Sequence, residues 1–448
     1  MTYAECIDFL QQLGHELRGV KFDLAVIQAL LEALGNPHLR YPSIIVAGTN
    51  GKGSACAMIA SILERAGYRT GLYTSPHLVR VNERIRLNGR DISDGDFAAA
   101  LSEVRERAEY LRSALPQRPS FFEYLTAAAF LSFARDDVQF AVLEVGMGGR
   151  LDATNVTEPR VAIITNVELD HQEFLGNTVA AIAREKAGVI KPNRPVISGA
   201  ERPEAAEVIR GRCLELSAEL LELPRDATAC NVRNQGGWFS FDLTLKGRSI
   251  TGLAPALAGR FQVQNAMAAV AAALELRERG FSIPLQAIRQ GLRRARWPGR
   301  LDVIARRPMT VLDGAHNPAA ALELAAFARE QFRGRRVRLV YASMRDKAIE
   351  EISAILFPIA SEVYVTQVAT ARAATPEEIL RRAGPQRGRI MIEPDAERAL
   401  NAALEASSRE DVVLAAGSLF LVGAALEARG AGRLGVKPVV KENQSCPN

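Results

Sequence analysis

The sequence predicts an α/β protein made of two units, each a largely parallel sheet covered by helices. Apolar, strand-like runs alternate with helical patterns along most of the chain, as in sheets joined by crossover helices. The length of 448 residues is also more than one ordinary core holds. The alternation stops at residues 296–300 (RWPGR), where Pro and Gly stand together, and then restarts.

The first unit contains three runs typical of buried parallel strands: residues 43–48 (SIIVAG), 140–146 (FAVLEVG) and 161–167 (VAIITNV). Helical patterns lie between them at residues 54–67 and 123–135. Residues 231–247 (NVRNQGGWFSFDLTLKG) predict a hairpin. Two further helices are expected at residues 265–277 and 284–294.

The second unit predicts a smaller, doubly wound sheet of Rossmann type. Its expected strands lie in TVLDGAHNP, RVRLVYASM, SEVYVTQV, GRIMIEP and DVVLAAGS, with helices between them. We therefore divide the chain into residues 1–297, residues 298–430 and a tail of residues 431–448. The tail has no periodicity, and we expect it to be disordered.

The composition is that of a globular protein, with 48% hydrophobic and 24% charged residues. No apolar run reaches the roughly 20 residues that span a bilayer, and the N-terminus resembles neither a signal nor a transit peptide. The five cysteines form no C-x-x-C pair, which argues against structural zinc and fits a reducing compartment. A net charge of +5 without a basic, aromatic-rich tract argues against nucleic acid. We expect a cytoplasmic protein with neither nucleic-acid nor membrane partners.

Residues 48–54 (GTNGKGS) follow the first strand and open the next helix, the context of a phosphate-binding loop. The spacing differs from the usual G-x-x-x-x-G-K-[ST], because Gly53 separates Lys52 from Ser54. We therefore expect Ser54 not to reach a magnesium ion. The alternative is a glycine-rich turn that binds nothing.

Candidate metal ligands follow other strands. Glu144 ends the strand FAVLE, the position at which P-loop proteins hold Mg²⁺. His171 lies beyond the next strand, with Asp170 an equally good candidate on chemistry alone, although a lone His is more often packed or on the surface. Ser75, after the strand that follows the loop helix, would complete an oxygen-rich shell.

Together these motifs resemble the folylpolyglutamate synthase and dihydrofolate synthase family of the Mur ligase superfamily. The resemblance runs from about residue 46 to residue 423 and rests on the blocks VAGTNGKGS, TSPHLVRVNERIRLNG, FFEYLTAAAF, LEVGMGGRLDATN, LDHQEFLG, EKAGVIKP, RFQVQNA, WPGRLDVI, LDGAHNP and AAGSLFLVG. It implies a Mur-ligase-like P-loop ATPase domain followed by a smaller Rossmann-like domain. The unusual loop spacing is that of the family.

The resemblance also implies ATP-dependent amide formation with ATP and Mg²⁺ as cofactors. A substrate carboxylate attacks the γ-phosphate of ATP, and the amine of L-glutamate then attacks the resulting acyl phosphate. The acceptor would be dihydropteroate, giving dihydrofolate, or a folate, which is polyglutamylated. The family's small domain closes on ATP and shields the acyl phosphate from water. We expect a monomer.

The ATP-binding residues that the resemblance implies come from both units: Asn50, Gly51, Lys52, Gly53, Ser54, Asn265, Arg300, Asp313 and His316. Lys52 and His316 would also act in catalysis. Structural alternatives exist: Asn265 as a helix cap or interior amide, Asp313 as a turn residue, and Arg300 as a hinge residue with a salt bridge. Ser418 in AAGSLF is expected to be a helix cap first and a ligand second.

By the same resemblance, Ser75, Glu144 and His171 would bind magnesium. Lys186 would be catalytic as a carbamylated lysine that positions the ion; its alternative is a solvated lysine on an amphipathic helix. The implied pteroate site is formed by Phe121, Phe122, Glu123, Leu151, Asp152 and Ala153. An aromatic ring can cover a pterin and carboxylates can accept its N–H groups, whereas two phenylalanines on a helix are by default core residues.

Three alternatives remain open. The enzyme could only extend folates, or it could be a Mur ligase acting on a uridine-linked carboxylate, although TSPHLVRVNERIRLNG resembles the folate branch. It could also be a nucleotide-binding regulatory module without ligase chemistry. Lys52, Glu144, His171 and the DGAHNP loop are all present, so the sequence offers no cause for lost activity. A regulatory GTPase is disfavoured because no Asn-Lys-x-Asp motif follows a strand.

Overall fold

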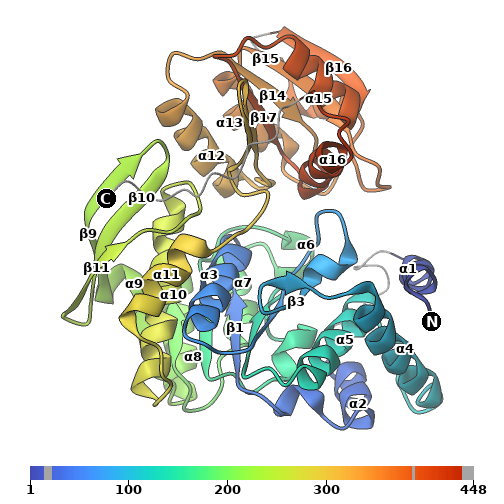
Figure 1. Ribbon diagram of the computed structural model, residues 1–448, viewed down its shortest axis with the longest axis vertical. Coiled ribbons are helices and arrows are strands. Elements are labelled where there is room, and N and C mark those ends of the chain that lie inside the picture. The colour runs from blue at the N-terminus through green and yellow to red at the C-terminus, as the bar shows by residue number, and fades with distance from the viewer. Residues whose placement is uncertain (15–22, 386–388, 436–448) are drawn as a thin grey trace. The chain divides into compact units, whose positions relative to one another are not determined.

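The structure, a computed structural model, describes residues 1–14, 23–385 and 389–435. These residues form two compact units (Figure 1). The N-terminal unit comprises Met1–Asn234, Phe239–Ala256 and Phe261–Arg296. The C-terminal unit comprises the chain from Trp297 onward together with Gln235–Trp238 and Leu257–Arg260.

An eight-stranded sheet with the order β4-β3-β2-β5-β1-β6-β7-β8 is the centre of the N-terminal unit. Its strands are β1 (Ser43–Ala47), β2 (Thr70–Tyr73), β3 (Ile85–Leu87), β4 (Arg90–Asp91), β5 (Phe140–Glu144), β6 (Val161–Ile164), β7 (Val196–Ser198) and β8 (Leu220–Glu222). Six neighbouring strands are parallel: β2, β5, β1, β6, β7 and β8. The strands β3 and β4 add an antiparallel edge beside β2. The three predicted strands are confirmed as β1, β5 and β6, and every residue in them is buried, as continuous apolar runs predict.

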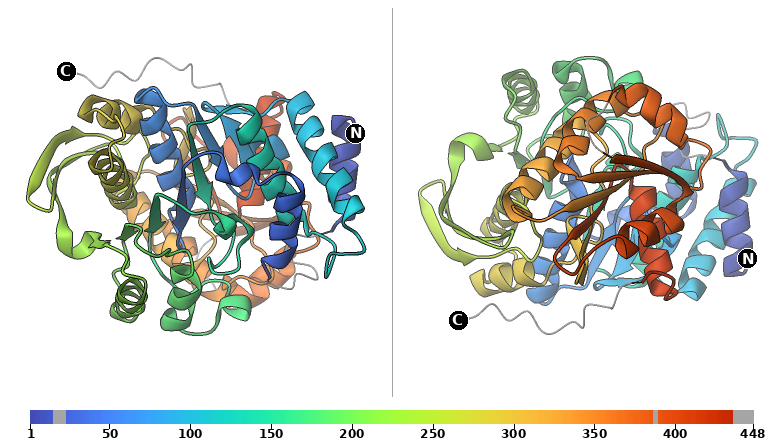
Figure 2. Two further views of the ribbon diagram at one scale, coloured as in Figure 1. Left: turned by 90° about the horizontal axis from the view of Figure 1, so that it is seen from below. Right: turned by 90° about the horizontal axis from the view of Figure 1, so that it is seen from above.

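Helices cover both faces of this sheet (Figure 2). One face carries α3 (Lys52–Arg65), α10 (Phe261–Glu278) and α11 (Leu285–Arg294), which pack on one another. The close approach of α11 to α3 requires Gly291, since a Cβ there would lie 2.5 Å from Ile62 Cα. The other face carries α4 (Asp94–Tyr110), α5 (Phe121–Arg135), α7 (Val179–Ala187) and α8 (Pro203–Glu215). Shorter helices complete the unit: α1 (Tyr3–Gln12), α2 (Ala25–Ala33), α6 (Gln172–Leu175) and α9 (Leu223–Asp226).

The predicted hairpin is confirmed, but it belongs to a three-stranded sheet. Its strands are β9 (Ala227–Gln235), β10 (Trp238–Leu245) and β11 (Arg248–Leu253), in the order β11-β10-β9. Gly236 and Gly237 form the first turn, both with positive φ. The strand β11 was not predicted, because RSITGL is short, polar and only weakly alternating.

The C-terminal unit contains a six-stranded sheet with the order β12-β13-β17-β14-β15-β16. Its strands are β12 (Asp302–Arg306), β13 (Met309–Leu312), β14 (Val337–Tyr341), β15 (Glu362–Gln367), β16 (Arg389–Asp395) and β17 (Val412–Ala416). All pairs are parallel except β12 with β13, an antiparallel edge that the sequence pattern did not predict. Three helices, α12 (Pro318–Gln331), α13 (Ile349–Leu356) and α14 (Pro376–Ala383), cover one face, while α15 (Ala396–Glu405) and α16 (Leu419–Gly430) cover the other (Figure 2).

The first residues of the expected tail make contacts with the C-terminal unit. Leu434 is buried, and Asn401 on α15 bonds to the carbonyl of Arg433 and to the amide of Gly435. Residues 436–448, the remainder of that tail, lie outside the described residues. Among the helices that are described, none has both the length and the apolarity to cross a membrane.

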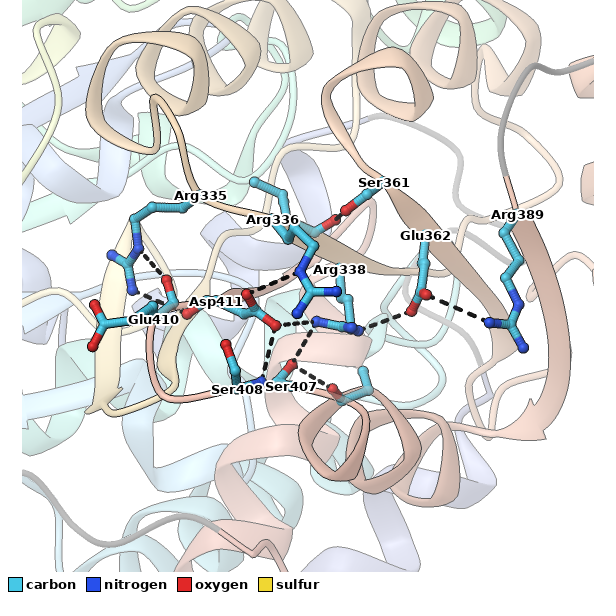
Figure 3. Close-up of polar contacts among 12 residues, drawn as sticks. Arg335, Arg336, Arg338, Ser361, Glu362, Arg389, Ser407, Ser408, Glu410 and Asp411 are labelled. Atoms are coloured by element: carbon cyan, nitrogen blue, oxygen red, sulfur yellow. Dashed lines mark hydrogen bonds and ion pairs between the residues drawn. The ribbon is translucent and has the colours of Figure 1, made fainter.

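A buried ionic network lies at the amino ends of β14, β15 and β17 (Figure 3). Arg338 donates from Nη1 to Asp411 Oδ2 at 2.7 Å and from Nε to Glu362 Oε2 at 2.8 Å. Burial by itself would raise the pKa of Asp411, but the amide of Ser408 and the guanidinium of Arg338 hold that pKa at about 2. The network joins three strands that are far apart in sequence.

Replacing Asp411 by Asn should therefore destabilise the protein by about 3 kcal/mol, at the lower end for a broken buried pair because Glu362 still neutralises Arg338. The exposed pair of Glu397 with Arg433 provides a matched control, and Glu397→Asn or Glu397→Gln should cost less than about 1 kcal/mol. Because the folded-state pKa of Asp411 is depressed, its stabilisation is complete above the ordinary pKa of 3.8 and is lost as the pH falls towards 2. Urea unfolding of both variants measures the difference; equal losses would contradict the assignment.

Candidate functional site

The candidate site of the N-terminal unit lies where three neighbouring strands end. In the sheet register Val46 pairs with Glu144 and Ala47 pairs with Ile164, so the carboxyl ends of β5, β1 and β6 lie side by side. The chain leaves β1 towards β2 and leaves β5 towards β6, in opposite directions along the sheet. Such a switch point is where open α/β sheets bind ligands.

The predicted phosphate loop has the backbone that its glycines allow. Gly48 has φ +146° and Gly51 has φ +84°, a conformation that L side chains rarely adopt. The helix α3 begins immediately afterwards, at Lys52. The amides of its first turn have no partner within the helix and point along a dipole that favours anions. A Cβ on Gly51 would lie 2.3 Å from Asn265 Oδ1, so α10 closes one side of the loop.

Two lysines converge on one carbonyl of this loop. Lys52 Nζ donates to Gly48 O at 3.0 Å and to Thr49 O at 3.1 Å, and Lys186 Nζ donates to Gly48 O at 2.9 Å. Lys186 is only 3% exposed, so it is not the solvated lysine of the alternative interpretation. Its burial, aided by the charge of Lys52 and opposed by that of Asp170, lowers its pKa to about 7.

The glycine-rich loop after β5 holds the helix that carries Lys186. A Cβ on Gly149 would lie 2.8 Å from Glu185 O, and one on Gly188 would lie 2.3 Å from Arg150 Cα. The Asn155 amide group donates to Arg150 O at 2.9 Å and to Gly188 O at 3.0 Å. This contact between loop and helix was not predicted, although the glycines of MGGRLDATN indicate a close approach of the backbone.

Of the candidate metal ligands, the structure brings Ser75 and Glu144 together. The buried Glu144 accepts a hydrogen bond at Oε2 from the Ser75 amide at 3.1 Å. His171 stands before α6 in the left-handed region, with φ 49°, and its amide donates to Asp170 Oδ1 at 2.9 Å. Across the described ranges, no three His, Cys, Asp or Glu side chains gather as a metal-binding cluster. This sparse, oxygen-bearing set fits Mg²⁺, which commonly takes one or two carboxylates and completes its shell with phosphate and water.

Ser54 is engaged elsewhere. Its hydroxyl accepts from Gln262 Nε2 at 3.2 Å, and Gln262 Oε1 accepts from Asn265 Nδ2 at 2.9 Å. All three side chains are buried. Ser54 thus joins the loop helix to α10; that it does not reach a magnesium ion stays a prediction. The role of Gln262 was not predicted.

The two carboxylates of the expected pteroate site bond to the chain itself. Glu123 Oε2 accepts from the amide of Ser120 at 2.8 Å and from its hydroxyl at 2.7 Å, which completes the capping box of α5. Asp152 accepts from Thr154 N at 3.0 Å and from Met147 N at 3.0 Å. Burial raises the pKa of both groups above its ordinary value. Their first role is structural: they fix the start of α5 and the glycine-rich loop.

The two phenylalanines are half-buried rather than wholly in the core. The ring of Phe122 lies 5.9 Å from that of Tyr73, and its Cζ would be 2.7 Å from a Cβ on Gly146. The guanidinium of Arg84 lies over Phe121, 5.2 Å from the ring centroid. Leu151 is half-buried and Ala153 is buried at the same loop.

In the C-terminal unit, Arg300, Asp313 and His316 gather at the carboxyl end of β13. The buried carboxylate of Asp313 accepts from Leu301 N at 2.8 Å and from Ala315 N at 2.9 Å, the turn role considered above. Burial raises its pKa, and the charge of Arg300 partly offsets this. His316 Nδ1 lies 2.7 Å from Gly314 O. Ser418 caps α16 by accepting from Phe420 N at 3.1 Å, which confirms its expected cap.

Comparisons with known proteins agree along most of the chain. Residues 46–273 match the Mur ligase middle domain, and residues 299–419 match the Mur ligase glutamate ligase domain. The dihydrofolate synthase/folylpolyglutamate synthase of Bacillus subtilis is 37% identical, over 81% of this chain and 84% of the relative. The enzyme of the same name from Escherichia coli is 33% identical, over 88% and 87%.

Solved structures are similar as well. The folylpolyglutamate synthase of Mycobacterium tuberculosis complexed with ADP has a TM-score of 0.89 at 32% identity, covering 97% of this chain and 99% of its own. Escherichia coli FolC in complex with DHPP and ADP has a TM-score of 0.86 at 30% identity, covering 97% and 100%.

Gly51→Ala should raise the Kd for ADP by about tenfold or more. The added methyl group would collide with Asn265, and alanine disfavours the positive φ that the loop requires at this position. Gly67→Ala is the matched control: Gly67 has φ +93° but a Cβ there meets nothing within 4 Å. It should cost about 1 kcal/mol of stability and leave ADP binding unchanged. Calorimetric titration of both variants makes the comparison; equal affinities would show that the contact with Asn265 does not matter.

Proposed function

The chain belongs to the dihydrofolate synthase/folylpolyglutamate synthase family of Mur ligases, and from this premise we propose that it joins L-glutamate to dihydropteroate and to folates at the expense of ATP. It is an ATP-dependent ligase. The observation that carries the proposal is the convergence of Lys52 and Lys186 on Gly48 O, next to the strand that ends at Glu144. This arrangement places the charge of Lys52 at the start of a helix, where phosphates bind, with Lys186 beside it.

In the proposed reaction an oxygen of the acceptor carboxylate attacks the γ-phosphorus of ATP. A C–O–P linkage forms, the bond to the β-phosphate oxygen breaks, and ADP leaves. The amine of glutamate then attacks the acyl carbon, loses a proton and expels phosphate, which leaves an amide. Lys52 and the first-turn amides of α3 would stabilise the charge that develops on the transferred phosphoryl group.

Ser75, Glu144 and His171 are the residues that we propose to hold Mg²⁺. When bound, the ion would neutralise phosphate charge. Glu144 would supply the carboxylate, and the adjacent Ser75 amide already fixes the orientation of that carboxylate. Asn265 and the gathered Arg300, Asp313 and His316 remain proposed contacts of ATP, and His316 remains a proposed catalytic residue.

The proposed pteroate site uses Phe121 and Phe122 as the apolar surface for the pterin. Leu151, Asp152 and Ala153 would shape its other side. Because Glu123 and Asp152 already accept hydrogen bonds from the chain, we propose that they act mainly by fixing the walls of the site. A monomer in the cytoplasm is our proposal for assembly and location; the four cysteines within the described residues are all free thiols, as a reducing compartment requires.

We also propose that Lys186 is carbamylated. A lysine amine must be neutral to react with CO₂, and a pKa of about 7 leaves roughly half of the amines neutral at pH 7, against less than about 0.1% for an ordinary lysine. The nitrogen forms a bond to carbon and loses a proton, and the product is a carbamate anion. That carboxylate would add an oxygen ligand beside Glu144 and His171.

The ligase assignment predicts phosphate release from ATP that requires L-glutamate and a pteroyl acceptor. Release with both dihydropteroate and tetrahydrofolate is expected and would support both activities. Release with tetrahydrofolate alone would restrict the enzyme to extending folates. ATP binding without acceptor-dependent release would favour the regulatory module, and a uridine-linked acceptor would then be tested.

Lys186→Arg should reduce turnover by at least about 100-fold, because arginine stays protonated and cannot form a carbamate. Lys191→Arg is the control, since Lys191 is half-buried four residues beyond the end of α7 and donates to Asn155 O at 2.9 Å. With ¹³C-bicarbonate, the wild-type protein should give a carbamate signal above pH 7 that fades below it, and Lys186→Arg should give none. A signal that survives this substitution would refute the assignment.

A further inference from the structure

The loop that follows β6 is hydrogen-bonded to the phosphate loop through the side chains of Thr165 and Asn166. Neither residue belongs to a predicted site or to the proposed reaction. We propose that Thr165 and Asn166 are positioning residues for nucleotide binding: they fix the backbone of Asn50 and thereby set the shape of the phosphate loop. The inference rests on the proposed function, because the ligand of that loop is taken to be the phosphates of ATP. We call these two residues the β6 clamp.

Both backbone groups of Asn50 are held by the β6 clamp. Thr165 Oγ1 donates to Asn50 O at 2.6 Å, and the Asn50 amide donates to Asn166 Oδ1 at 2.9 Å. The preceding amide of Thr49 also donates to Asn166 O, at 3.1 Å. The backbone groups of Asn50 are thus used in hydrogen bonds that hold the loop. Phosphate would instead bind to the amides of the first turn of α3.

A second contact places Thr165 against Gly48. A Cβ on Gly48 would lie 1.9 Å from Thr165 Oγ1, so the hydroxyl fills the space that the glycine leaves. The carbonyl of this same Gly48 accepts from both Lys52 and Lys186. A shift of Thr165 would therefore move the peptide group of Gly48, and with it the carbonyl that accepts from the two lysines.

A further pair of hydrogen bonds joins the two segments, between Thr49, which precedes Asn50, and Glu168, two residues after Asn166. Thr49 Oγ1 accepts from Glu168 N at 3.0 Å and lies 3.2 Å from Glu168 O, to which it donates. The segment that begins with the β6 clamp continues to His171, a proposed metal ligand. The same stretch of backbone therefore positions both the phosphate loop and a proposed metal ligand. Such preorganisation reduces the conformational entropy that the loop loses when it binds a ligand.

The test compares Thr165→Val with Thr165→Ser in the full-length protein. Valine has the shape of threonine but loses the hydrogen bond, and a methyl carbon needs about 3.3 Å or more from a carbonyl oxygen where the hydroxyl takes 2.6 Å. We expect Thr165→Val to raise the Kd for ADP about tenfold and Thr165→Ser to stay within about threefold of wild type. The KM for ATP should rise with it, while the KM for the pteroyl acceptor stays unchanged.

Thr310→Val is the matched control, because Thr310 is a buried threonine of the C-terminal unit whose hydroxyl donates to Pro308 O at 3.3 Å. It should lower the melting temperature without changing the Kd for ADP. Thr165→Val binding ADP as tightly as wild type would overturn the inference, whatever its melting temperature.

Should Thr165→Val show no cooperative unfolding transition, Asn166→Ala decides the matter. It should also raise the Kd for ADP, and hydrogen exchange at the Asn50 amide should accelerate; a wild-type Kd would overturn the inference. A wild-type chain that binds no ADP would defeat the proposed function and the inference together. That outcome is distinct from a binding wild type with unaffected variants, which defeats the inference alone.

Discussion

The site of the N-terminal unit depends on one constraint: the backbone between β1 and α3 must reverse within a few residues without side chains in the way. Gly48 and Gly51 meet it with φ values of +146° and +84°. Their missing Cβ atoms leave room for Thr165 on one side and Asn265 on the other. The carbonyl that this conformation exposes at Gly48 collects two lysines. The same peptide groups therefore determine the shape of the loop, the position of the two lysines and the point at which α3 begins.

A buried amine and a buried carboxylate near such a loop must each be neutralised or hydrogen-bonded. Backbone groups supply hydrogen bonds to each of them: Lys186 donates to a carbonyl, Glu144 accepts from an amide, and Asp152 and Asp313 accept from amides at their own turns. Burial lowers the pKa of Lys186 and raises that of Asp313. At Asp313 the charge of Arg300 and the amides of Leu301 and Ala315 partly offset the rise, because they favour the ionised carboxylate.

The sequence predicted most of the parallel strands because buried runs such as FAVLE and VAII carry a strong apolar signal. It missed β11 and β12, which are edge strands with short and mixed patterns. At the site, the motif residues were predictable because their chemistry is visible in the letters. Thr165, Gln262 and Asn155 were not, because each acts on backbone or on another side chain brought near only by the fold. The structural use of Glu123 and Asp152 was hidden for the same reason.

The ionic network around Arg338 has a consequence for how the C-terminal unit tolerates change. It lies at the amino ends of β14, β15 and β17 (Figure 3). Asp313, His316 and Ser418 instead follow the carboxyl ends of β13 and β17. At the amino ends the strands are joined by the ion pairs of Arg338, and at the carboxyl ends the loops are held by hydrogen bonds within their own turns. Substitutions in these loops should therefore disturb the pairing of the strands less than substitutions in the ionic network. The residues least open to substitution in this unit are expected to include some that never meet a substrate.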